Sequence, residues 1–69
     1  MGSDDTKLAN IFKDAREKIG LTQAEAAKKA SIHANYYARV ERGEVTPRVD
    51  IVEKIARALK LNLRLPLDK

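Results

Sequence analysis

Apolar residues recur at three- and four-residue steps in four separate stretches of this 69-residue chain. That spacing places them on one side of an α-helix, because a helix returns to the same face every three or four residues. The expected fold class is therefore all-α, in a single domain. The pattern predicts helices over residues 6–19, 23–30, 34–41 and 49–60.

Local signals mark the end of the first helix and the start of the second. Gly20 follows the apolar residues of the first helix, where a helix stop is expected. Thr22 and Glu25 have the spacing of a capping box, in which hydroxyl and carboxylate each accept a backbone N–H bond. The second helix should therefore begin at Gln23. The predicted apolar face of the first helix consists of Leu8, Ile11, Phe12, Ala15 and Ile19.

The residue inventory excludes several ways of stabilising so small a domain. The chain has no cysteine and one histidine, so we expect no disulfide, no metal and no cofactor. No apolar run approaches the roughly 18 residues that a membrane span needs, and no signal peptide opens the chain. We expect a cytoplasmic protein, with a disordered leader over residues 1–5 and one folded domain over residues 6–61.

The chain is basic, with 14 lysines and arginines against 10 acidic residues and a net charge of +4. Two of the acids, Asp4 and Asp5, lie in the expected leader, so the folded part is more basic still. Such an excess favours a polyanionic partner. An enzyme is not expected, because the chain has no glycine-rich phosphate loop and its acidic pairs are ordinary helix-surface charges.

The last part of the chain has a different periodicity. Leucine occupies every second position from residue 59 to residue 67, and this alternation is typical of a β-strand. Pro66 argues against a helix there. A lone strand has no partner in a helical domain, but a second copy of the chain would supply one. We therefore predict that residues 62–69 form a dimerisation extension, with contacts from Leu61, Leu63, Leu65 and Leu67.

The stretch "LTQAEAAKKASIHANYYARVERGEVTP" encodes two short helices joined by a turn at residues 31–33. That is helix-turn-helix geometry, in which the second helix enters the major groove of DNA. The chain resembles the lambda-repressor and Cro-like (xenobiotic-response-element) helix-turn-helix family of bacterial and phage regulators over about residues 8–61. The resemblance is carried by "GLTQAE", "AAKKA", Ile32, "RVERG" with a downstream "TP", and "IVEKIARAL".

The resemblance implies a bundle of four to five helices, but several residues depart from the family pattern. Ser31 stands where glycine is usual, so a positive φ there would strain it. His33 stands where serine or threonine usually caps the second helix of the motif. Tyr37 replaces an aliphatic core residue, and we expect it to pack in the core. Pro66 interrupts the segment where many members form a fifth helix.

The resemblance also implies which side chains would meet DNA. Asn35 could pair with adenine and Arg39 with guanine, each contributing about 1–3 kcal/mol of discrimination. Ala34 could touch a thymine methyl group, and His33 is either a base contact or a turn residue. The alternative for this whole face is an ordinary solvated helix surface. The expected phosphate and backbone contacts are Thr22, Gln23, Lys28, Tyr36, Arg42 and Arg48, with Lys29 less strongly indicated.

Arg16 and Glu41 match positions that form an internal ion pair in related domains. Such a pair would tie the first helix to the second helix of the motif. The function implied is sequence-specific binding of double-stranded DNA by a transcriptional regulator, with a repressor preferred, acting as a homodimer on a pseudo-palindromic operator. Two alternatives stay open: a DNA-binding antitoxin with a toxin protein as partner, and a protein–protein adaptor that does not bind DNA.

Overall fold

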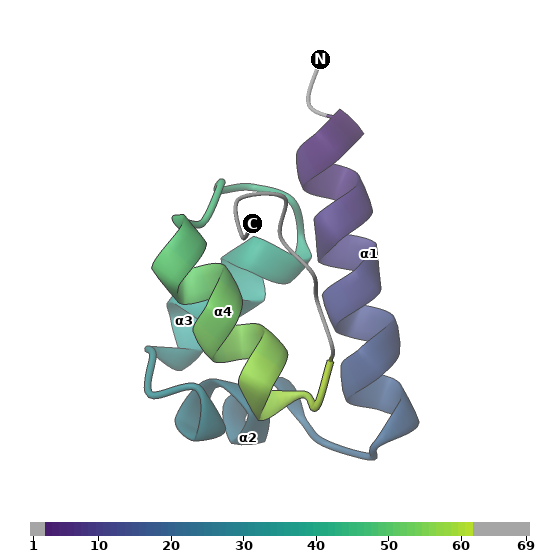
Figure 1. The fold of residues 1–69 in the computed structure, drawn as a ribbon, viewed down its shortest axis with the longest axis vertical. Coiled ribbons are helices and arrows are strands. Elements are labelled where there is room, and N and C mark those ends of the chain that lie inside the picture. The colour runs from purple at the N-terminus through teal and green to yellow at the C-terminus, as the bar shows by residue number, and fades with distance from the viewer. Residues whose placement is uncertain (1–2, 62–69) are drawn as a thin grey trace, which may run out of the picture.

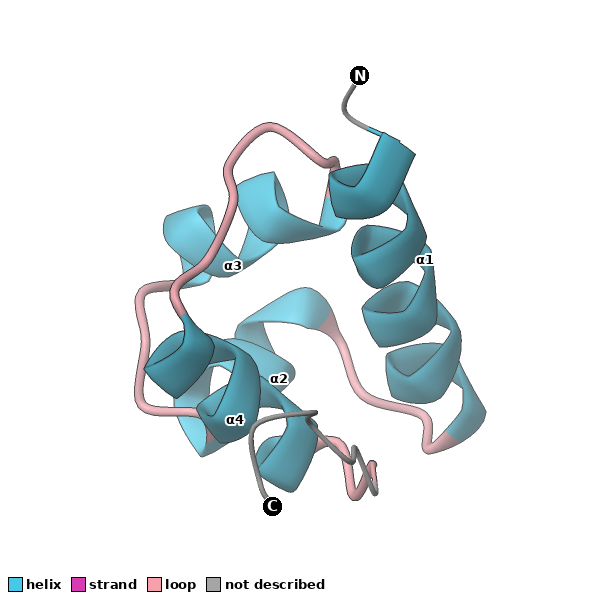
Figure 2. Ribbon diagram, turned by 45° about the horizontal axis from the view of Figure 1, so that its top comes forward, coloured by secondary structure: helices cyan, strands magenta, loops and turns pink. Residues whose placement is uncertain are grey.

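The computed structural model describes residues 3–61, and side chains from residue 7. It confirms an all-α fold, with no strand in the described part (Figures 1 and 2). α1 stands along one side of the molecule, and α2 packs against both α3 and α4 on the other side. None of these helices is long and apolar enough to cross a membrane. The helices are α1 (Ser3–Lys18), α2 (Gln23–Lys29), α3 (Ala34–Glu41) and α4 (Val49–Ala58).

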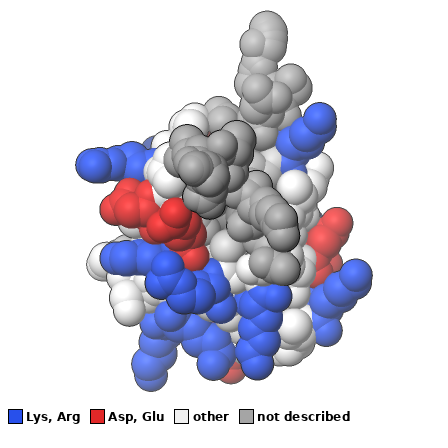
Figure 3. All heavy atoms as spheres, viewed as in Figure 1, with Lys and Arg blue, Asp and Glu red and all other residues white. Residues whose placement is uncertain are grey.

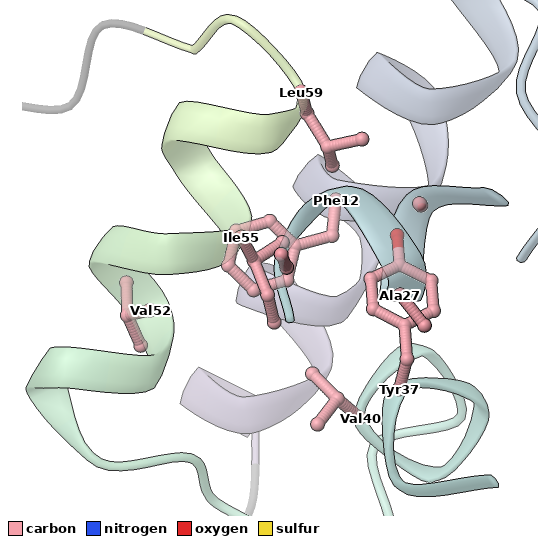
Figure 4. Packing of buried hydrophobic residues seen from close by; sticks show 9 residues of the cluster. Phe12, Ala27, Tyr37, Val40, Val52, Ile55 and Leu59 are labelled. Carbon is pink, nitrogen blue, oxygen red and sulfur yellow. The ribbon is translucent and has the colours of Figure 1, made fainter. Parts of the chain in front are cut away.

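The core is one cluster to which all of the helices contribute (Figure 4). Phe12 of α1, Tyr37 of α3 and Ile55 of α4 are each fully buried. α2 contributes only alanines, and these small side chains let α3 and α4 approach it closely. Tyr37 points into the cluster from α3, which confirms its predicted place in the core. The core alanines here are Ala26 and Ala27 of α2 and Ala30, which caps its carboxyl end.

Each helix ends in the same type of turn, a Schellman motif. A residue with positive φ follows each helix: Gly20 at 76°, Ser31 at 59°, Gly43 at 74° and Lys60 at 60°. The N–H of the next residue then donates to the carbonyl oxygen five residues earlier. These bonds are Leu21 to Arg16 (3.1 Å), Ile32 to Ala27 (3.0 Å), Glu44 to Arg39 (3.0 Å) and Leu61 to Ala56 (2.8 Å).

Ser31 is therefore a strained residue, as its departure from the family pattern suggested. Left-handed backbone costs a residue with a Cβ roughly 1–2 kcal/mol, and glycine avoids that cost at an entropic cost of about 0.5–1 kcal/mol. Ser31→Gly is expected to raise the free energy of unfolding by about 0.5–1 kcal/mol, and the melting temperature by a few degrees. Thermal unfolding would measure this change. Ser31→Ala is the control and should give no gain; equal melting temperatures for the two variants would contradict the prediction.

Four helix boundaries differ from the sequence-based expectation, two of them by one residue: α1 ends at Lys18 rather than Ile19, and α2 ends at Lys29 rather than Ala30. α1 begins at Ser3 rather than Thr6, so residues 3–5, expected to be a disordered leader, are helical. α4 ends at Ala58 rather than Lys60, because Lys60 adopts the left-handed conformation that terminates it.

The buried side of α1 is also narrower than predicted. Ile11 and Ile19 are 43% and 42% exposed, whereas Ala9 is 3% exposed and takes part in the core. The three- and four-residue spacing gives a stripe of apolar residues but not its width, which depends on how many neighbours the helix has. Among the described helices α1 packs mainly against α3, so one flank of its apolar stripe remains at the surface.

The predicted dimerisation segment lies mostly outside the described residues, and this includes Leu63, Leu65 and Leu67. Leu61 is described, and it is half-buried against the core of its own domain. Its backbone N–H is used by the turn that ends α4. Leu61 therefore packs on the helical domain, and its predicted role at a dimer interface stays a prediction.

Candidate nucleic-acid interface

α2 and α3 form a helix-turn-helix whose first helix starts with the predicted capping box. The Glu25 N–H donates to Thr22 Oγ1 at 3.0 Å, and the Thr22 N–H donates to Glu25 Oε1 at 2.9 Å. α3 begins at Ala34, and the side chain of His33 makes no capping hydrogen bond to it. α3 is therefore held in place mainly by the side chains that it buries.

The two faces of α3 are sharply different. Tyr37, Val40 and Glu41 are buried, and they lie at the three- and four-residue steps that define one side of a helix. The opposite side is exposed. It carries Asn35 and Arg39, which are four residues apart, while Ala34 is exposed in the first turn of α3 and His33 just before the helix begins. All four side chains predicted to contact bases are therefore exposed, and Asn35 and Arg39 share one face of α3.

The buried face of α3 is attached to α1 and α2 by polar contacts around Glu41. Arg16 Nε donates to Glu41 Oε2 at 2.7 Å, and Arg16 Nη2 donates to Glu41 Oε1 at 3.1 Å. Gln23 Nε2 donates to Glu41 Oε1 at 3.0 Å. A further bond runs from Arg16 Nη1 to the carbonyl oxygen of Leu21 at 2.8 Å. The ion pair predicted for Arg16 and Glu41 is therefore present, with Gln23 as a third member.

Burial and hydrogen bonding act in opposite directions on Glu41. Burial alone would raise the pKa of the Glu41 carboxyl, but the hydrogen bonds from Arg16 and Gln23 outweigh it and lower that pKa. The hydrogen bond to Glu41 raises the pKa of Arg16. Burial raises the pKa of the Tyr37 phenol, whose oxygen makes no hydrogen bond within the described residues. Because the pKa of Glu41 is lowered, its carboxyl is ionised in the folded protein at neutral pH.

The lowered pKa of Glu41 predicts a loss of stability in acid. A carboxyl whose pKa is lower in the folded than in the unfolded chain stabilises the fold above its unfolded pKa, and this contribution is lost as the pH falls through the folded value. The melting temperature should therefore fall as the pH drops below about 4.5, the ordinary value for glutamate. Glu41→Gln cannot titrate and should show a flatter profile. Parallel profiles for the two proteins would contradict this assignment.

One residue of this surface was missed by the sequence analysis. Glu44 follows α3, and its carboxylate lies between two of the predicted DNA-contacting arginines. Arg42 donates to it through Nε at 2.7 Å and through Nη2 at 3.3 Å, and Arg39 Nε lies 3.5 Å from its Oε1. These hydrogen bonds raise the pKa of Arg42 and lower that of Glu44. Gly43 is the sequence signal that could have indicated this position of Glu44, since a turn at Gly43 brings the next residue back beside the last turn of α3.

The expected phosphate contacts lie in different settings. Thr22, Lys28 and Lys29 are exposed on or beside α2, and Arg48 is exposed before α4, with Nε 3.8 Å from Asp50 Oδ1. Tyr36 is half-buried and packs against the core. Gln23 is turned inward to Glu41, so the structure shows it bracing α3.

Basic side chains also gather away from α3. Figure 3 shows lysines and arginines over the lower part of the face in view, where α2 and the end of α4 lie in Figure 1. Lys29, Lys54 and Arg57 line one shallow hollow formed by residues at the carboxyl ends of α2 and α4. The described residues contain no group of three or more side chains that could hold a metal ion.

A family model described as helix-turn-helix matches residues 12–65 of the chain. This range contains α2, the turn, α3 and α4, together with the second half of α1. No curated protein and no solved structure matches the chain.

Proposed function

The chain belongs to the lambda-repressor and Cro-like helix-turn-helix family of DNA-binding transcription regulators, and we propose that it is a repressor that reads a specific double-stranded site with the exposed face of α3. The observation that carries this proposal is the division of α3 into a buried face and an exposed face. The exposed face holds Asn35 and Arg39, two side chains suited to base edges.

Rigidity is the second requirement for reading bases. A helix that must be ordered on binding would lose affinity to the entropy of ordering it. The contacts of Glu41 with Arg16 and Gln23 join α3 to α1 and α2 before any DNA is present. The exposed face of α3 is therefore presented in a defined orientation, as specific recognition requires.

Phosphate contacts would fix the register of α3 on the duplex but would carry no sequence information. We assign this role to the exposed residues that flank α3 on both sides, which act through charge or hydroxyl groups. Gln23 would contribute mainly by bracing α3. Tyr36 would contact a phosphate from the edge of the core. The proposed phosphate contacts are Thr22, Lys28, Arg42 and Arg48.

Selection of bound sequences from a random duplex library, at a stated salt concentration, tests this function. We expect one enriched motif, with affinity that falls as salt rises because binding releases counterions from the DNA and this release is less favourable at high salt. Binding with no preferred sequence would overturn the proposed specificity. Absence of any salt-dependent binding would favour a protein–protein adaptor instead. Co-purification with the product of a neighbouring gene would indicate an antitoxin.

We further propose that the protein binds as a homodimer, and that the alternating leucines after α4 join the two copies. Two α3 helices one turn of DNA apart, about 34 Å, would double the number of base contacts and make the motif palindromic. Sedimentation of Leu63→Ser/Leu65→Ser should show a shift toward monomer. Asn62→Ser/Arg64→Ser alters the intervening positions and is the matched control. A double leucine variant that remains dimeric would refute this role.

A further inference from the structure

The carboxylate of Glu44 bridges two arginines at the carboxyl end of α3. We propose that Glu44 is a specificity-determining residue, which orients Arg39 for base recognition and weakens binding to duplexes that lack the recognised sequence. This inference rests on the proposed DNA-binding function. It assigns a role to an acidic residue on a surface that otherwise attracts phosphates.

The two arginines are held differently. Arg42 uses both Nε and Nη2 on Glu44, at 2.7 Å and 3.3 Å, so one edge of its guanidinium is occupied. The ion pair of Arg39 with Glu44 is made through Nε, at 3.5 Å from Oε1. The two terminal amino groups of Arg39 therefore remain available, and these can donate together to O6 and N7 of guanine. Glu44 thus restrains Arg39 at Nε, the nitrogen that this paired contact with guanine does not use.

The backbone keeps Glu44 in this position. Gly43 has a φ of 74°, and its N–H donates to the carbonyl oxygen of Val40 at 3.0 Å. The Glu44 N–H donates to the carbonyl oxygen of Arg39, also at 3.0 Å. The turn that ends α3 therefore returns Glu44 to the same helical turn from which Arg39 projects.

The energetic consequence differs between matched and unmatched DNA. Any duplex attracts the basic surface through its phosphates, but the charge of Glu44 repels phosphates and neutralises part of the charge of its arginine partners. The side chains of Arg39, Arg42 and Glu44 are 54%, 56% and 46% exposed, so they are accessible to DNA. Only a sequence that contacts Arg39 through its base edges compensates for this repulsion. Glu44 should therefore widen the ratio between specific and non-specific affinity.

Glu44→Gln tests the inference on the full chain, with the selected duplex and a scrambled duplex of equal length. We expect the variant to bind the scrambled duplex about 3–10-fold more tightly at low salt. Its slope of log affinity against log salt concentration should steepen by about 1–2. Each additional cation that pairs with a phosphate adds about 0.9 to the magnitude of this slope. Affinity for the selected duplex should change less, so the specificity ratio falls at least threefold. Asp14→Asn, an exposed residue of α1, makes the same charge change and should leave the ratio unaltered.

A double variant separates positioning from simple charge. If Glu44 acts through Arg39, Glu44→Gln should no longer change the specificity ratio when Arg39 is already alanine. Equal tightening on both duplexes, or an effect no larger than that of Asp14→Asn, would overturn the inference while leaving the proposed function intact. Wild-type protein that binds neither duplex in a salt-dependent way would overturn the proposed function itself, and with it the role of Glu44.

Discussion

Replacing Glu41 with alanine is expected to lower the free energy of unfolding by about 3–5 kcal/mol, because it strands the guanidinium of Arg16 without its partner. The side chains of Arg16 and Glu41 are only 12% and 2% exposed, so solvent screens their interaction little. Gln23 loses its acceptor in the same variant. A chain of this length has a total stability of about 3–10 kcal/mol, so much of the population should unfold. Denaturant unfolding followed by circular dichroism would measure the loss.

A double-mutant cycle separates the ion pair from other effects of the substitution. Arg16→Ala should also destabilise strongly, and the double variant should lose much less than the sum of the two single losses. Glu53→Ala is the control, since Glu53 is exposed on α4 and should change stability by no more than about 0.5 kcal/mol. A stability for Glu41→Ala equal to that of this control would show that the buried pair does not hold α3 in place.

The second large effect concerns binding. Asn35→Ala combined with Arg39→Ala should weaken binding to the selected duplex by at least about 30-fold, since two base contacts of about 1–3 kcal/mol each are removed. Both side chains are exposed, so the fold should be unaffected. Fluorescence anisotropy with a labelled duplex would measure the change, with circular dichroism confirming that the variant is folded.

A charge-matched control is needed because Arg39 also attracts phosphates. Lys13→Ala removes one exposed positive charge from α1, outside the helix-turn-helix. It should weaken binding only slightly, and to the same degree for selected and scrambled duplexes. If Lys13→Ala and the double variant of α3 lowered affinity equally, the exposed face of α3 would be acting as general positive charge and not as a reader of bases.

Much of this arrangement follows from local signals in the sequence. The capping box at Thr22 and the stop at Gly20 depend only on neighbouring residues; α2 begins where it was predicted, and α1 ends within one residue of its predicted end. The bounds of α3 agree fully, because its apolar positions and the Gly43 stop lie close together. The pairing of Arg16 with Glu41 joins residues far apart in the chain, and only the family resemblance indicated it.

Other features depend on tertiary neighbours that no local pattern records. Ile11 and Ile19 share the helical spacing of Phe12, yet only Phe12 is buried, because α1 packs mainly against α3 and only one flank of its apolar stripe is covered. Lys60 ends α4 in a conformation that favours glycine, so the helical spacing of the apolar residues before it predicted too long a helix. The bridging place of Glu44 required knowing the direction of the turn after Arg42.

The central claim is that the exposed face of α3 reads the edges of base pairs. Comparing the sequences selected from a random duplex library by the wild-type protein and by Arg39→Ala tests it most directly. Our account predicts that the variant loses preference at one base pair of the motif, or at its two symmetric copies, and retains the preferences elsewhere. An unchanged motif, or a wild-type protein that enriches no motif, would contradict it.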